Sequence, residues 1–162
     1  MEKKYKLTEE TLKIYGHVLH RIMALRDFGD VRKGDIGGWV ENEDNLSHDD
    51  DCWVYNNVRV YEEARVYGVA EVYGEARVYG NAQVCGNAVI KKMSDYIVFR
   101  NWWSSGRHFT WTRSNDMWSA GCFYGTGEEL IEKAYADSEE KGREYERIVK
   151  YVESIKSEIN KQ

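Results

Sequence analysis

The most regular feature of the chain is an aliphatic residue that returns every six positions. It forms the column Val54, Val60, Val66, Val72, Val78, Val84 and Ile90. A mostly small residue stands two positions before each later member, at Val58, Ala64, Ala70, Ala76, Ala82 and Ala88. Six is a multiple of the two-residue period of a strand, so both columns can share one side of an extended chain that bends between them. An α-helix would spread such a column around its surface, because six residues rotate it by about 600°.

The repeated phrase RVYGVAEVYGEARVYGNAQVCGNA, residues 65–88, resembles the hexapeptide-repeat superfamily of left-handed parallel β-helices. That superfamily has an aliphatic residue at the first position of each repeat and a small residue four positions later, and residues 54–91 match it. The resemblance implies that three hexapeptides form one triangular turn, so Val54 would stack under Val72 and Ile90. Upstream, the residues at 40, 46 and 52 would continue the small-residue column. His48 then falls where an inward aliphatic residue is expected.

The segments outside the repeat predict a cap at each end. Residues 5–25 read as a β-hairpin that turns at residues 16–17. After the repeat, residues 96–103, 107–113 and 117–123 read as three strands, and residues 127–136 and 138–159 as two helices. The first helix starts with the capping box Thr126-Gly127-Glu128-Glu129.

The predicted fold is therefore mainly β. A short left-handed parallel β-helix carries an N-terminal β-hairpin cap and a C-terminal module with a small sheet and two helices. We expect an N-terminal β cap over residues 1–38, the β-helix over residues 39–92, and the α+β module with its terminal helix over residues 93–162.

Composition limits the class of protein. Of 162 residues, 42% are hydrophobic and 31% are charged, and no apolar run approaches the roughly 18 residues that a membrane helix needs. The charged N-terminus has no apolar segment after it, so a cytoplasmic location is expected. Cys52, Cys85 and Cys122 lack CxxC spacing, which predicts reduced thiols without a zinc site or disulfide framework. Neither a metal nor a cofactor is expected, and a net charge of −5 disfavours generic nucleic-acid binding.

A longer series of segments is similar to a family of uncharacterised bacterial and phage hexapeptide-repeat proteins. The series consists of ALRDFGDV, GDIGGWVE, NLSHDDDCWVY, the hexapeptides and GCFYGTGEEL. Members of that family are named as transferases or polymer-forming proteins on the strength of the repeat. The resemblance implies a phage- or prophage-encoded protein, whereas function must be argued from particular residues.

Two histidines are candidates for catalysis. Many hexapeptide-repeat proteins are trimeric acyltransferases with a histidine base between subunits, and His48 is the nearest candidate here, although its position favours a structural, end-capping role. If Arg113 opposes Met117 across a hairpin, His108 lies opposite Cys122, and a Cys–His pair can generate a thiolate nucleophile. A register shift of one residue would separate that pair.

Aromatic and arginine residues are the candidates for binding. Tyr55 and Tyr73 point outward and would stack, as would Arg59 and Arg77; these rows could stabilise the sheet, form a trimer face or hold an anion. Four tryptophans crowd the small C-terminal sheet beside Arg107 and Arg113, and residues of these types are enriched at binding hot spots. The tryptophans are Trp102, Trp103, Trp111 and Trp118.

The sequence favours a non-catalytic binding protein, expected to be a homotrimer. It would inhibit or sequester a host factor, either a defence or regulatory protein or a small anionic or nucleotide ligand. One alternative is a hexapeptide-type acyltransferase that works at trimer clefts. Another is a structural element that assembles with copies of itself.

Overall fold

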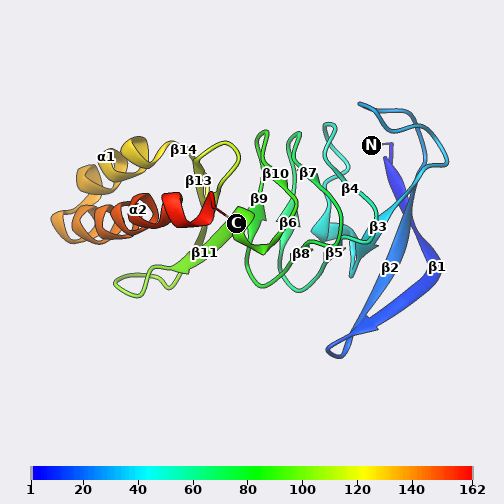
Figure 1. Cartoon of the computed structure of the whole chain (residues 1–162), viewed down its shortest axis with the longest axis horizontal. Helices are drawn as coiled ribbons and strands as arrows, with labels where there is room; N and C mark the ends of the chain where they lie inside the picture. Colours follow the sequence, from blue (N-terminus) through cyan, green and yellow to red (C-terminus); the bar gives the residue numbers. More distant parts are fainter. Residues whose placement is uncertain (1, 162) are drawn as a thin grey trace.

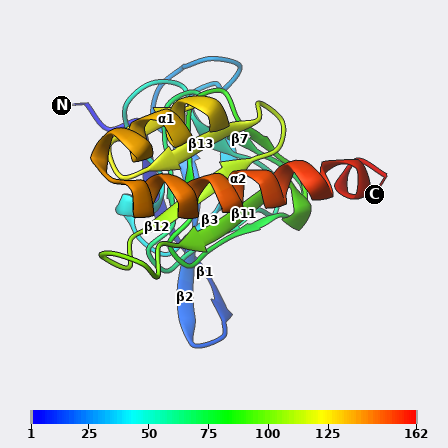
Figure 2. The same cartoon turned by 90° about the vertical axis from the view of Figure 1, so that its left-hand side faces the viewer.

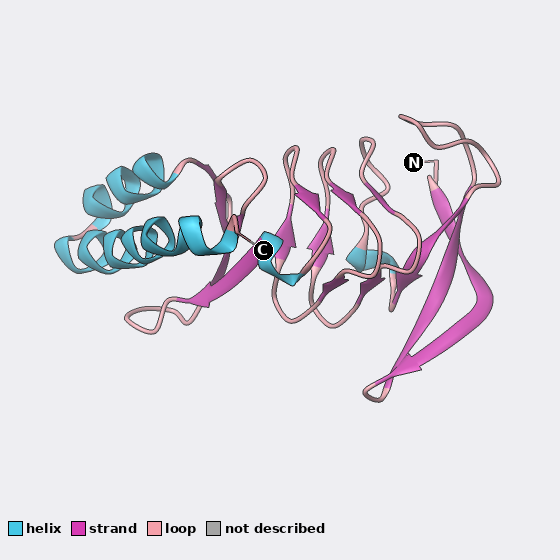
Figure 3. Ribbon diagram, viewed as in Figure 1, coloured by secondary structure: helices cyan, strands magenta, loops and turns pink. Residues whose placement is uncertain are grey.

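Seven two-residue strands occupy the repeat in the computed structural model, which describes residues 2–161 (Figures 1 and 3). They are β4 (Trp53–Val54), β5 (Arg59–Val60), β6 (Arg65–Val66), β7 (Glu71–Val72), β8 (Arg77–Val78), β9 (Gln83–Val84) and β10 (Val89–Ile90). Each pairs in parallel with the strand 18 residues away, as Val54 with Val72 and Val60 with Val78. The predicted stacking of residues 18 apart is confirmed.

The two inward columns form the core of this stack. Every member of the aliphatic column is fully buried, and the alanines of the small column are at most 4% exposed. Backbone N–H groups of one turn donate to carbonyls of the next, as from Tyr55 to Val72 at 2.8 Å and from Arg65 to Ala82 at 2.9 Å. The repeat thus satisfies its backbone polar groups between neighbouring turns.

The first turn of the stack is two residues longer than the others. Strand β3 (Ile36–Val40) pairs with β5 so that Val40 lies beside Val60, and Leu46 bridges to Val66. Both spacings are 20 residues, so these two side chains continue the aliphatic column, and their predicted place in the small column is wrong. The extra residues fall between Leu46 and Cys52. The inward position predicted for His48 is therefore also wrong: it lies in an enlarged corner.

The N-terminal cap is the predicted hairpin. Strands β1 (Tyr5–Ile14) and β2 (His17–Ala24) pair antiparallel around a turn at residues 15–16, and β2 also pairs with β3. One sheet consequently runs in the order β1-β2-β3-β5-β8. The hairpin tip projects beyond the side of the stack (Figures 1 and 2).

Lys4 closes the base of the stack. Its fully buried ammonium donates to the carbonyl of Cys52 at 2.6 Å and to that of Asp50 at 3.2 Å. The neighbouring Tyr5 hydroxyl donates to the carbonyl of Leu46 at 2.6 Å. Burial lowers the pKa of Lys4, because the charged form loses hydration.

The C-terminal module contains a four-stranded antiparallel sheet and two helices. The strands are β11 (Tyr96–Arg100), β12 (His108–Thr112), β13 (Met117–Ala120) and β14 (Phe123–Gly125). The last predicted strand is thus two strands, because the chain turns at Gly121, whose φ is +60°. Helices α1 (Gly127–Asp137) and α2 (Glu139–Ile159) follow, and the predicted capping box is present. Short 3-10 turns lie at Glu43–Asn45 and Met93–Asp95.

Within residues 2–161, no helix has the length and apolar character needed to cross a membrane.

Candidate functional site

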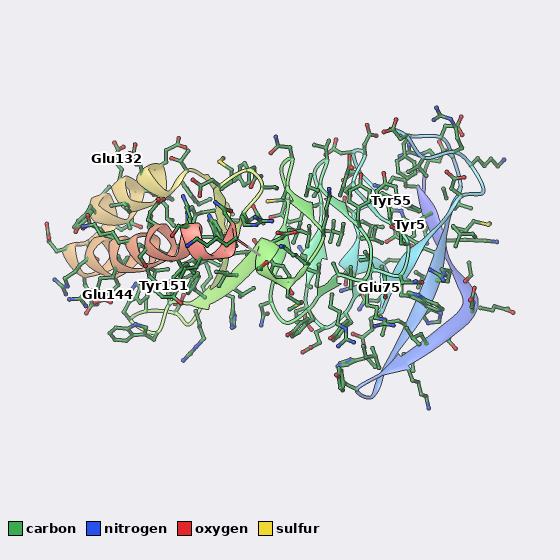
Figure 4. The ribbon with its side chains drawn as sticks, in the orientation of Figure 1. Tyr5, Tyr55, Glu75, Glu132, Glu144 and Tyr151 are labelled. Carbon is green, nitrogen blue, oxygen red and sulfur yellow. The ribbon has the colours of Figure 1, made fainter. Side chains whose placement is uncertain are left out.

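An open groove of about 720 Å³ lies between the hairpin tip and the outer face of β5 and β8. Glu75, labelled in Figure 4, lines it on the side of the stack from which the hairpin projects. The hairpin, the stack and the segment after β10 all contribute residues. The lining consists of Tyr15, His17, Tyr61, Glu62, Glu75, Ala76, Arg77, Tyr79, Lys91, Lys92 and Met93.

Stacked aromatic rings form the floor of this groove. Tyr61 and Tyr79 follow successive inward valines, and their rings lie 5.3 Å apart and 7° from parallel. The hairpin covers Tyr61 to 3% exposure but leaves Tyr79 39% exposed. Because the register places Arg77 two residues before Tyr79 on the same outward face, a cation and an exposed ring stand side by side.

The hairpin tip contributes a second exposed ring and contacts this cation. Tyr15 is 78% exposed, and its ring centre lies 5.9 Å from the guanidinium carbon of Arg77. A hydrogen bond with the Tyr15 side chain raises the pKa of Arg77, which stays charged at neutral pH. Tyr15 and Tyr79 therefore flank a permanent positive charge.

His17 is the histidine that lines the groove. Its Nδ1 lies 2.8 Å from Oε2 of Glu41, and the other Glu41 oxygen accepts from the backbone N–H of Glu62 at 2.8 Å. The carboxylate thereby fixes the imidazole, and among residues 2–161 no hydrogen bond engages Nε2. An oriented histidine of this kind can donate to, or accept from, a bound molecule.

Asp95 and Arg113 hold the lysine segment in place. One oxygen of the buried Asp95 accepts from the backbone N–H groups of Lys91 at 2.7 Å and Lys92 at 3.1 Å. The other oxygen accepts from Nε of Arg113 at 2.8 Å. Arg113, predicted as a binding residue, thus supports the groove from behind.

A smaller cavity of about 380 Å³ adjoins the groove. The two share Tyr79 and Met93 as lining residues. Its other walls come from the next corner and the start of the C-terminal sheet: Gly80, Asn81, Tyr96, Ile97, Val98 and His108. The result is a trough with one section that carries charged residues and a second section that no Lys, Arg, Asp or Glu of the described residues lines.

The four tryptophans divide between core and surface. Trp111 and Trp118 are buried in the core between the C-terminal sheet and the helices, and Trp103 packs on Tyr145 with ring centres 5.0 Å apart. Trp102 is 65% exposed on the loop after β11. Of the predicted tryptophan surface, Trp102 alone offers most of its ring to a partner.

The remaining predicted binding residues lie on separate faces. Tyr55, which is labelled in Figure 4, stacks on Tyr73 as predicted, with ring centres 4.5 Å apart, on the β4–β7–β10 face. Arg59 lies beside Arg77 as predicted, and its buried Nε has no hydrogen-bond partner within the described residues. Arg107 packs against Gly121, where an added Cβ would lie 2.6 Å from its guanidinium. Arg77 lines the groove, whereas Tyr55, Tyr73, Arg59 and Arg107 do not.

Both ring nitrogens of His48 have structural partners. Nδ1 accepts the backbone N–H of Lys4 at 3.1 Å, and Nε2 lies 2.9 Å from Glu43, while the ring stacks on Tyr5. Hydrogen bonds from Lys3 and then His48 hold the pKa of Glu43 below its usual range. The geometry fits an end-capping histidine better than a catalytic base.

The predicted His108–Cys122 pair is absent. Met117 pairs with Thr112 instead of Arg113, so the register differs by one residue from the one that would join the pair. His108 of β12 pairs with Arg100 of β11, and Cys122 is exposed in the turn between β13 and β14. A one-residue change sends side chains to opposite faces of the sheet.

The sequence prediction missed most of the groove, including Tyr15, His17, Lys91 and Met93. The Lys91-Lys92 pair directly after the last repeat was a usable signal, because cations there flank the final exposed ring of the tyrosine row. His17 carried no comparable signal, since its partner Glu41 is 24 residues away.

No protein-family model matches the chain. Over 63 residues, the chain is 33% identical to the uncharacterized acetyltransferase YdcK of Escherichia coli (strain K12). The match covers 33% of this chain and 19% of that protein. This similarity is consistent with the hexapeptide-repeat superfamily.

Proposed function

We propose that this chain is a non-catalytic binding protein that holds an anionic partner in the groove beside the hairpin. The observation that carries the proposal is the meeting of Arg77 and Lys91 with the exposed rings of Tyr15 and Tyr79. These cations line the groove of a chain whose net charge is −5. The positive charge is thus a local feature of this groove.

The chemistry of the lining favours a ligand with an anionic group beside an apolar or aromatic one. Exposed tyrosines provide flat apolar contact area with little conformational freedom to lose. Arginine and lysine donate charge-assisted hydrogen bonds to carboxylate, sulfonate or phosphate oxygens. An open groove of about 720 Å³ is within the size range of small-ligand sites and also admits a segment of a protein.

The repeat supports a rigid platform for this groove. We propose that residues 39–92 form a short left-handed parallel β-helix, on the basis of the 18-residue stacking and the similarity to YdcK. A homotrimer and a phage-encoded protein directed at a host factor remain predictions from the family resemblance.

Fluorescence titration with 1-anilinonaphthalene-8-sulfonate tests the proposal, because this dye joins a sulfonate to aromatic rings. The double variant Arg77→Ala/Lys91→Ala should bind the dye about tenfold more weakly than the wild type, since it removes two cations. Added salt should weaken wild-type binding, because part of the groove is open to screening ions.

Arg65→Ala is the matched control. Arg65 occupies the same repeat position as Arg77 but lies on β6, in a different sheet. Its loss should leave dye affinity unchanged. Equal affinity in the wild type and the double variant, with both folded by circular dichroism, would contradict the proposed function.

Acyl transfer is the second candidate, favoured by the name of the similar protein and by the oriented His17. With Glu41 on Nδ1, the free Nε2 could accept a proton from an acceptor amine or hydroxyl in the groove. The acyl group would then pass from the donor thioester to that nucleophile and release a thiol.

A thiol-release assay with acetyl-CoA and a panel of amine acceptors tests this candidate. Turnover that His17→Gln abolishes and His48→Gln retains would establish it. Absence of acceptor-dependent thiol release from the folded wild type would exclude acyl transfer to those acceptors and leave the binding proposal.

A further inference from the structure

The strand β11 is an unpaired edge of the C-terminal sheet. The strand order is β11-β12-β13-β14, and no described strand pairs with the outer side of β11. Figures 1 and 2 show β11 at the margin of the module, on the side where the hairpin projects. An unpaired edge presents a row of backbone donors and acceptors to any extended chain that reaches it.

The hydrogen bonds at the two ends of β11 identify its free groups. Asn101 N–H donates to the carbonyl of Arg107, and Arg113 N–H donates to that of Asp95. Hydrogen-bonded residues alternate in an antiparallel pair, so residues 97 and 99 face β12 and residues 96 and 98 face outward. The N–H and C=O of Val98 lie at the centre of this free edge.

The other sheet edges in the described residues are short, bulged or charged, whereas β11 is not, and the edge strands of the repeat (β4, β6, β8, β9 and β10) have only two residues each. β1 is interrupted by a bulge between Leu7 and Thr11 and carries four charged side chains along its length. β14 has only three residues. β11 reads Tyr-Ile-Val-Phe-Arg, without a bulge and with its one charge at the far end. Bulges, charges and short strands are the usual means of preventing strand addition, so the free edge of β11 is exceptional here.

The cavities place side-chain sites next to this edge. Tyr96, Ile97 and Val98 are consecutive along β11, and all three line the 380 Å³ cavity that continues into the groove. Only Ser94 and Asp95 separate the Lys91–Met93 segment from the N-terminal end of β11. A chain laid along β11 could therefore bring alternate side chains to the 380 Å³ cavity and its end to the groove that holds Arg77 and Lys91.

We propose that β11 accepts an extended peptide segment of a partner protein, added antiparallel, with acidic residues at the C-terminal end of that segment. An antiparallel strand ends beside the N-terminal end of β11, next to Lys91 and Arg77. This inference deepens the proposed function and rests on it, since it identifies the anionic partner of the groove as an acidic peptide.

Fluorescence anisotropy with a fluorescein-labelled octapeptide, Ser-Val-Thr-Val-Thr-Val-Glu-Glu, tests the inference. The reversed peptide, with the same composition and both glutamates first, should bind at least about tenfold more weakly because its acids face away from the groove. Two further peptides carry N-methyl groups at the odd-numbered or at the even-numbered central residues. One of them should bind about tenfold more weakly and the other almost unchanged, since only every second N–H group of an added strand bonds to β11.

Val98→Pro tests the edge from the protein side. Proline removes an outward N–H while the hydrogen bonds to β12 remain, and edge strands tolerate such a residue. We expect at least about a tenfold loss of peptide affinity, and a clearly smaller loss for Val98→Thr, which keeps the N–H but adds a hydroxyl to the lining of the cavity. If Val98→Pro does not fold, the N-methylated peptides decide the question.

The outcomes separate this inference from the proposed function. Dye binding retained in Val98→Pro together with lost peptide binding supports both. Equal binding of forward, reversed and N-methylated peptides would overturn strand addition, even if the dye still depends on Arg77 and Lys91. If the affinity for the dye does not depend on Arg77 and Lys91, the proposed function of the groove is overturned.

Discussion

Two glycines of the repeat, Gly68 and Gly80, differ in one structural respect and so provide a sharp test of turn-on-turn stacking. Both have a φ of +68°. A Cβ added to Gly68 would lie 2.9 Å from the backbone N of Gly86, which is 18 residues further on in the next turn. A Cβ added to Gly80 would meet nothing within 4 Å, because the repeat has ended before its corner is covered.

The two alanine variants should therefore lose different amounts of stability. The positive φ costs an alanine about 1–2 kcal/mol at either site. At Gly68 the added methyl group also forces two stacked backbones apart, and overpacking of this kind costs about 1–3 kcal/mol. Gly68→Ala should thus lower the free energy of unfolding by about 2–5 kcal/mol and Gly80→Ala by about 1–2 kcal/mol.

Urea unfolding followed by far-ultraviolet circular dichroism measures both values. The free energy of unfolding is extrapolated to water for each variant, and equal slopes against urea show that the unfolded states are comparable. Losses that agree within about 0.5 kcal/mol would refute the stacking of these corners.

Three further predictions concern stability. Arg113→Met should lower the free energy of unfolding by about 3–5 kcal/mol, because it leaves the carboxylate of Asp95 buried without its cation; a loss below about 1 kcal/mol in urea unfolding would contradict this. Trp111→Ala should cost about 3–5 kcal/mol, whereas Trp102→Ala should change stability by no more than about 0.5 kcal/mol, and similar urea midpoints would oppose the assigned burial. Burial raises the pKa of Tyr67 to about 12. The stability that the neutral Tyr67 phenol contributes to the folded state is therefore complete below pH 10 and is lost as the pH rises toward about 12. Tyr67→Phe should accordingly show a shallower loss of urea midpoint over that interval than the wild type, and parallel losses would count against it.

The stack could be predicted from the sequence because every turn repeats the same local choices. Val60 and Val78 belong to the aliphatic column and Ala82 to the small-residue column, and both columns repeat at a fixed period. Once one residue of a column is known to point inward, the direction of the others follows. The enlarged first turn could not be predicted in this way. Its extra residues lie in a polar loop around His48, and this loop has no regularly spaced aliphatic or small residues that would reveal an insertion.

The groove depends on contacts between segments that are distant in sequence. Tyr15 and Arg77 meet because the sheet continues from the hairpin through β3 to β8, a pairing order that no local pattern encodes. In the C-terminal sheet, the observed register differs by one residue from the predicted one, and this difference separates His108 from Cys122. The four tryptophans were predicted as candidate binding residues, but Trp111 and Trp118 pack in the core against residues of the terminal helices.

The central claim is that the partner surface is the groove beside the hairpin. It is tested most directly by recording backbone amide chemical shifts while 1-anilinonaphthalene-8-sulfonate is added to ¹⁵N-labelled protein. We expect the largest, saturable changes at the amides of Tyr15, Arg77, Tyr79 and Lys91. Largest changes at Trp102 or along the β6–β9 face, with the groove amides unmoved, would contradict it.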